Sequence, residues 1–231
     1  LHRRSPDDVC GYYFPAMIDF DWELAGYDSA TDPEHGKVLL DRAIELGRKR
    51  IEAQPADAAA TYCLGAAYGT RAAYRFDRGE QLSGAFDAKK VRSVMFSLLE
   101  EDPSCEDCRF WTGTYDYMGA TLPTIVKFLK TLLFFPSGNR ERGLKLLDEA
   151  AQKGELERYH AFYILHVAYS EIEHDRTNDQ NVLERWRAAY PESPGVALML
   201  AQVLANSGRD GRSRSIVLLR EILDRVKAGQ I

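Results

Sequence analysis

The chain repeats part of its own pattern at a fixed offset of 48 residues. Two segments of equal length read QPADAAATYCLGAAY and DPSCEDCRFWTGTYD, and their alignment places Pro55 on Pro103 and Gly65 on Gly113. A fixed offset of this kind predicts an array of helical hairpins, in which each hairpin buries its apolar face against the next. Arrays of this architecture mostly bind other proteins, so interaction is the first functional expectation.

Hydrophobic residues recur with the helical period along the chain, and nothing shows the sustained alternation of a β-sheet. The fold class is therefore all-α. Proline and glycine mark the helix ends, and Asp57 and Ser104 are the expected N-caps of two of the helices. The expected helices cover residues 33–54, 58–76, 86–101, 105–117, 140–153, 155–173, 181–190, 196–206 and 213–227.

The short connections between these helices predict a single elongated helical repeat domain over residues 1–231. Residues 1–31 are the least regular part and form either an irregular segment or a partial repeat. Residues 32–121 hold the first repeats, residues 122–136 form an apolar insert, and residues 137–231 hold the later repeats.

Charge and hydropathy restrict the partners. The chain carries 30 Lys and Arg against 35 Asp and Glu, a formal net charge of −5, which argues against nucleic-acid binding because that requires a basic face. No stretch reaches the roughly 20 apolar residues of a transmembrane span. The best candidate, residues 122–135, is shorter and carries Lys127 and Lys130. It is either an amphipathic element that contacts a membrane or partner peripherally or, as we favour, a filler that packs into the curve of the array.

Two short signatures resemble tetratricopeptide (TPR) repeats. Leu64 and Gly65 followed by Tyr68 match the first-helix signature, and Ala43 with Pro55 matches the second-helix signature. The resemblance implies a right-handed α-α superhelix of about five hairpins. The offset of 48 residues exceeds the usual ~34, so the array is expected to be irregular.

A longer match supports the same family. The stretch from 102 to 191 is similar to a group of uncharacterised bacterial TPR proteins, in which an apolar segment starts with Leu-Pro and a later helix starts with a GNRERGL-like string. Here these are Leu122-Pro123 and residues 138–144. The resemblance favours a bacterial source and an exported or envelope-associated setting. The chain begins at Leu1 rather than Met, which is consistent with removal of an upstream targeting segment.

In TPR hairpins, four positions of each first helix line the concave face of the array. On the matching positions, the resemblance implies a ligand-binding surface made of Tyr62, Phe110, Thr114, Tyr117, Tyr159, Phe162, His166 and Tyr169. A groove rich in aromatic side chains suits an extended or helical peptide. The alternative is that these side chains pack against residues 122–135. The Lys and Asn clamp with which some TPR domains bind C-terminal carboxylates is missing at these positions.

Cys105 and Cys108 form a CxxC pair at an expected helix start, where the helix dipole favours a thiolate. The βαβ context of thioredoxin-like proteins is absent, Arg109 stands where haem attachment requires a histidine, and no second pair is spaced for zinc. We favour incidental helix contacts, with a local disulfide as the second interpretation and redox catalysis or metal binding as the third. Four cysteines do not predict a disulfide scaffold at this chain length.

The sequence thus predicts a protein-interaction scaffold that binds a protein or peptide, rather than an enzyme. His160, His166 and His174 are separated by six and eight residues and so point in different directions, which argues against a metal site. No cofactor motif occurs. The alternatives are a small-molecule binder that encloses its ligand in the curve and a thiol-redox protein. The oligomeric state is left open.

Overall fold

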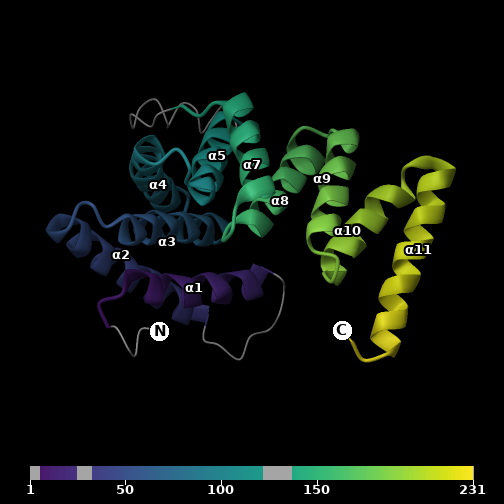
Figure 1. The fold of residues 1–231 in the computed structure, drawn as a ribbon, viewed down its shortest axis with the longest axis horizontal. Coiled ribbons are helices and arrows are strands. Elements are labelled where there is room, and N and C mark those ends of the chain that lie inside the picture. Colours follow the sequence, from purple (N-terminus) through teal and green to yellow (C-terminus); the bar gives the residue numbers. More distant parts are fainter. Residues whose placement is uncertain (1–5, 25–32, 122–136, 231) are drawn as a thin grey trace. The chain divides into compact units, whose positions relative to one another are not determined.

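The computed structural model describes residues 6–24, 33–121 and 137–230, and every regular element in this part of the chain is helical (Figure 1). The elements are α1 (Val9–Leu24), α2 (Pro33–Ala53), α3 (Ala58–Asp77), α4 (Gln81–Glu101), α5 (Glu106–Thr121), α7 (Arg140–Lys153), α8 (Arg158–Val167), the π-helical turn η1 (Ala168–Ile172), α9 (Arg176–Ala189), α10 (Pro194–Ala205) and α11 (Gly208–Lys227). The predicted all-α fold is confirmed.

The apolar insert at residues 122–136 lies outside the described residues, so both interpretations of it stay predictions. Among the helices that are described, none is long and apolar enough to cross a membrane.

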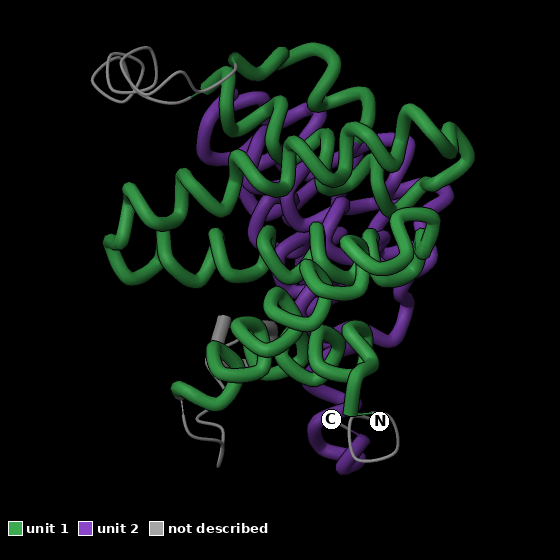
Figure 2. The backbone as a smooth tube through the Cα atoms, turned by 90° about the vertical axis from the view of Figure 1, so that its left-hand side faces the viewer, with its two compact units in different colours: residues 1–146 green, residues 147–231 purple. Residues whose placement is uncertain are grey.

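The chain forms two compact units, residues 1–146 and 147–231 (Figure 2). The boundary between them falls inside α7. Unit 1 contains α1 to α5 and the first half of α7, and unit 2 runs from the second half of α7 to α11. Whether the chain behaves as the single domain that the sequence predicts stays a prediction.

Unit 1 begins with a helix where the sequence left an irregular segment or a partial repeat as alternatives. Residues 9–24 form α1, which packs against α2 and α3. Tyr13 and Ala16 of α1 are fully buried. Further along, α3 packs on α2 and α4, and α4 packs on α5. Helix α1 is therefore packed into the helical array of unit 1.

Capping explains where α3 begins. The carboxylate of Asp57 accepts a hydrogen bond from the backbone N–H of Ala60 at 3.0 Å, as expected for an N-cap. That hydrogen bond and a second from Arg50 lower the pKa of Asp57. The predicted cap at Ser104 is wrong. The backbone N–H and hydroxyl of Ser104 both donate to the carboxylate of Asp102, which forms a turn ahead of α5.

In unit 2, α8 continues directly into η1, both pack against α9, and α9, α10 and α11 follow as successive neighbours. Asp175 caps α9 and Ser193 caps α10, so α9 begins at Arg176 instead of the predicted residue 181. The start of α11 was also misjudged, because the sequence placed it at residue 213. Gly208 has φ of +81° and starts the helix, whereas Gly211 lies within it.

Helices α7 and α5 approach each other closely at Gly143. A Cβ atom on Gly143 would lie 2.5 Å from the backbone N and 2.8 Å from the Cα of Tyr117. Because these are backbone atoms, the clash can be relieved only by moving a helix. We expect Gly143→Ala to destabilise unit 1 by about 1–3 kcal/mol, measured by urea unfolding.

Gly195 in α10 provides the matched control for Gly143. A Cβ atom there would meet nothing within 4 Å, and its φ is not positive, so Gly195→Ala is expected to be neutral or slightly stabilising. Equal unfolding midpoints for the two variants would contradict the close helix approach at Gly143.

Candidate functional site

In unit 1, most of the residues expected on the concave face are core residues. Tyr117 is fully buried, Phe110 is 5% exposed and Tyr62 is 9% exposed. Only Thr114 of this group is partly accessible. Phe110 packs edge-on against Trp111 with ring centroids 4.8 Å apart. The α5 aromatic residues therefore fill the space between helices, and the binding role predicted for Tyr62, Phe110 and Tyr117 is not supported by their burial.

In unit 2, the corresponding residues are more accessible. Tyr159 is 39% exposed, whereas His166 and Tyr169 are half-buried. Phe162 is only 2% exposed and belongs to the core. The sequence missed Tyr163, which is 40% exposed and lies one helical turn after Tyr159. Its spacing of four residues from Tyr159 was the available signal.

The accessible tyrosines of α8 rest on a buried tryptophan of α9. Trp186 is fully buried, and its ring centroid lies 4.9 Å from that of Tyr159 and 6.5 Å from that of Tyr163, both edge-on. Phe162 stacks on the same indole at 6.1 Å. Tyr190, at the end of α9, packs edge-on against Tyr159 at 5.2 Å. We call Tyr159, Tyr163 and Tyr190 the aromatic surface.

Tyr190 contributes a neutral hydroxyl group to the aromatic surface. Burial raises the pKa of Tyr190, and the nearby positive charge of Arg158 only partly offsets this effect. The Tyr190 phenol therefore stays protonated at neutral pH and is able to donate a hydrogen bond. Tyrosine rings that are already ordered by packing against Trp186 lose little side-chain entropy when they contact a ligand, and their hydroxyl groups are able to form hydrogen bonds with it.

His166 is fixed by a second contact between α8 and α9. Its Nδ1 lies 2.6 Å from Oδ1 of Asp179, whose side chain is almost completely buried. The π-helical turn η1 begins two residues later. Within the described residues no serine or cysteine hydrogen-bonds to this imidazole, so the pair has the geometry of a link between helices rather than of an activated nucleophile.

The four cysteines form two disulfides. Cys105 is bonded to Cys108, and Cys10 of α1 is bonded to Cys63 of α3. The interpretation of Cys105 and Cys108 as incidental helix contacts was therefore wrong, and the local disulfide is what the structure shows.

The bond between Cys10 and Cys63 was missed because their partnership depends on the packing of α1 against α3. Over the described ranges, no group of three or more histidine, cysteine, aspartate or glutamate side chains is placed to hold a metal ion.

No protein-family model matches the chain, and no curated protein sequence matches it. Among solved structures, one titled "Crystal structure of MamA" superposes with a TM-score of 0.51 and 15% sequence identity, over 88% of this chain and 98% of that chain. At this identity the similarity shows the fold alone. The chain has an all-α, TPR-like array of helical hairpins, as the sequence resemblance implied.

Proposed function

We propose that this chain is a protein-interaction scaffold that binds a peptide or protein segment through the aromatic surface of unit 2. The observation that supports it is the pairing of exposure and rigidity in α8. Tyr159 and Tyr163 are each about two-fifths exposed while their rings pack against the fully buried Trp186. The TPR-like fold agrees with a binding role. The proposal includes that the chain binds its partner without catalysing a reaction.

The energetics favour this surface over the residues first expected from the sequence. Tyrosine and tryptophan dominate the energies of protein interfaces, and their effect is largest when the rings are already ordered. Tyr117 and Phe162 are buried and would have to leave the core to contact a partner. Tyr159, Tyr163 and Tyr190 require no such change.

Site-specific photo-crosslinking is the direct test. A benzophenone amino acid placed at Tyr163 is expected to capture a partner segment in cells of the native organism, and the captured segment is then synthesised. Its dissociation constant for the purified chain, measured by calorimetry, should rise by about 30-fold or more for the double variant Tyr159→Ala, Tyr163→Ala, because two ordered aromatic contacts are lost.

Phe86→Ala is the matched control, since Phe86 is an exposed aromatic residue of α4 in unit 1. It should bind the segment as the unchanged chain does. Equal dissociation constants for the control and for the tyrosine double variant would refute binding at the aromatic surface.

A further inference from the structure

The last helix of unit 2 has an apolar side that no described helix covers. The helix α11 packs against α10 through Gly211 and Ser215: a Cβ on Gly211 would lie 2.5 Å from the carbonyl oxygen of Leu204, and the hydroxyl of Ser215 donates to the carbonyl of Ala201 at 2.7 Å. These contacts fix which side points outward. The exposed residues of that side are Ile216 (50%), Leu219 (39%), Leu223 (54%) and Val226 (52%). We call them the outer face of α11.

The outer face is a continuous stripe. Its members recur at spacings of three and four residues, so they share one side of the helix and extend over about 15 Å. Exposed aliphatic residues that occur singly need no explanation, but four in line on one helix form a patch that resembles an uncovered interface.

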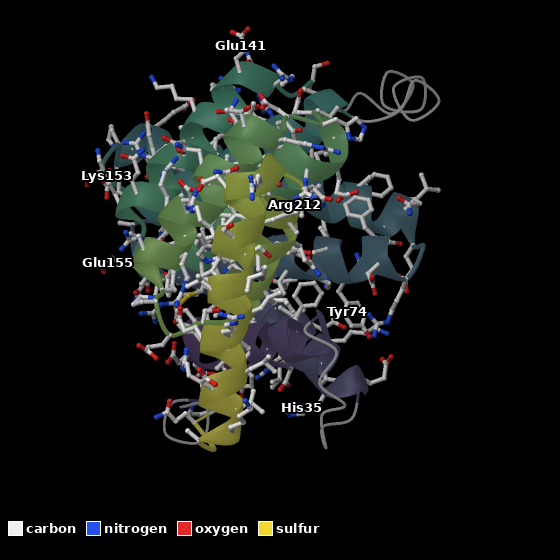
Figure 3. The ribbon with its side chains drawn as sticks, turned by 90° about the vertical axis from the view of Figure 1, so that its right-hand side faces the viewer. His35, Tyr74, Glu141, Lys153, Glu155 and Arg212 are labelled. Carbon is white, nitrogen blue, oxygen red and sulfur yellow. A yellow bond between two sulfur atoms is a disulfide. The ribbon has the colours of Figure 1, made fainter. Side chains whose placement is uncertain are left out.

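Cations lie along the same side. Arg209, Arg212, Arg220 and Lys227 continue the spacing of three and four residues at both ends of the stripe and beside it, and all four are exposed. Arg212 lies in the N-terminal part of α11 (Figure 3) and hydrogen-bonds to the carbonyl of Gly208. In the part of the chain that the structure describes, no acidic side chain pairs with Arg209, Arg212 or Arg220.

The opposite flank of α11 behaves differently. Arg214 pairs with Glu184 at 2.8 Å, and Arg225 pairs with Glu192 at 3.0 Å. Glu221 forms an ion pair with Arg187 of α9. The charges on this flank are therefore satisfied within unit 2. Lys227 also has a partner, Asp224 at 3.7 Å, so the unmatched positive charge beside the outer face is that of Arg209, Arg212 and Arg220.

We propose that the outer face of α11 binds an amphipathic helix of a partner protein, with the apolar side of that helix on the stripe and acidic residues beside the arginines. Charge complementarity identifies the partner chemistry, because carboxylates that flank an apolar stripe would pair with Arg212 and Arg220 as the stripe is covered. This surface is distinct from the aromatic surface, so the two proposals are tested independently.

Two other occupants fit less well. A second copy of the chain would bring the same three unpaired arginines against themselves, which is unfavourable in a two-fold symmetric contact. A membrane would have to accept Arg212 and Lys227 in line with the stripe, whereas helices that lie on membranes separate their cations onto the polar side. An amphipathic helix with acidic flanks would instead place its carboxylates next to these cations, where they form ion pairs.

A displayed library of amphipathic helices tests the proposal. The library keeps one apolar side constant and varies the flanking positions among Glu, Lys and Gln, and it is selected on the purified chain. We expect at least a tenfold enrichment of Glu over Lys at the flanks. Selection on Arg212→Glu, Arg220→Glu should invert that preference, because the charge of the surface is reversed.

Variants of the apolar stripe distinguish binding of a helix at the outer face from non-specific hydrophobic binding elsewhere on the chain. Leu219→Ser, Leu223→Ser should abolish enrichment, and since both residues are exposed the fold should be retained, which circular dichroism verifies. Val217→Ser is the matched control, because Val217 is the most exposed aliphatic residue of α11 (63%) and lies off the stripe. It should leave the enrichment unchanged.

Several results would overturn the proposal. Selected helices without an excess of Glu, or equal losses for Val217→Ser and the stripe variant, would show that the outer face does not select an acidic helix. Self-association in sedimentation that Leu223→Ser abolishes would identify a second copy as the occupant. Binding to vesicles that contain phosphatidylglycerol, without selection of any helix, would identify a membrane.

Discussion

Replacing Asp87 by alanine is expected to lower the free energy of unfolding of unit 1 by about 3–5 kcal/mol, because it leaves two partly buried arginines without the buried anion that they share. Asp87 of α4 is 3% exposed. It accepts hydrogen bonds from Nε and Nη2 of Arg71 at 2.8 and 2.7 Å and from Nη1 of Arg75 at 2.6 Å. Both arginines belong to α3, so a single carboxylate ties the two helices of this hairpin together.

The partial burial and the charge of Arg71 explain why the expected loss of stability is large. Burial by itself would lower the pKa of Arg71, but hydrogen bonds to Asp87 and Asp41 outweigh it and raise the pKa above its usual value. An arginine side chain stays charged in a protein, so without Asp87 the desolvation of Arg71 is offset only by the half-exposed Asp41. Urea unfolding followed by circular dichroism measures the change, and hydrogen exchange in α3 and α4 assigns it to unit 1.

Asp41→Ala supplies the comparison. Asp41 of α2 also bonds to Arg71, at 2.6 Å, but its side chain is half exposed, so its loss should cost less than about 1 kcal/mol. Asp87→Asn should fall between the two alanine variants, since it keeps the volume and part of the hydrogen bonding. If Asp87→Ala and Asp41→Ala unfold at the same urea concentration, the stability of unit 1 does not depend on the burial of the Asp87 carboxylate.

Helices with strong boundary residues were predictable from the sequence. The expected range 140–153 coincides with α7, because an apolar period runs unbroken between Asn139 and Gly154. Residue 58 likewise begins α3, since Asp57 caps it. The helix α1 was not predicted. It contains Pro15 and aromatic residues on more than one side, so neither propensity nor a clear period reveals it.

The candidate site was only partly predictable, because burial depends on the rotation of each helix against its neighbour. Phe162 and Tyr163 are adjacent in sequence and differ by about 100° around α8, yet one is buried and the other exposed. A family pattern selected Phe162, which stacks on Trp186 and is buried, whereas Tyr163 contacts the same indole edge-on and is 40% exposed. Partners distant in sequence, such as Arg71 and Asp87, become visible only when two helices are in contact.

The disulfides should differ greatly in their effect on stability. Removing the bond between Cys10 and Cys63 by alanine substitutions is expected to cost about 4 kcal/mol, and removing the bond between Cys105 and Cys108 about 1.5 kcal/mol. The chain-entropy relation gives these values because the first bond closes a loop of about 53 residues and the second a loop of about 3. The first bond also holds α1 on α3, which joins the first hairpin to the second.

Urea unfolding with and without a reductant separates the two bonds. The unchanged chain and the variant Cys105→Ala, Cys108→Ala should both lose most of this stability on reduction, whereas the variant Cys10→Ala, Cys63→Ala should respond only weakly. Because such a bond persists only in an oxidising compartment, alkylation of the protein taken directly from native cells should find Cys10 and Cys63 blocked. Equal sensitivity of both variants to the reductant would mean that loop length does not govern the stabilisation, and free thiols at Cys10 and Cys63 in cells would argue against the exported setting.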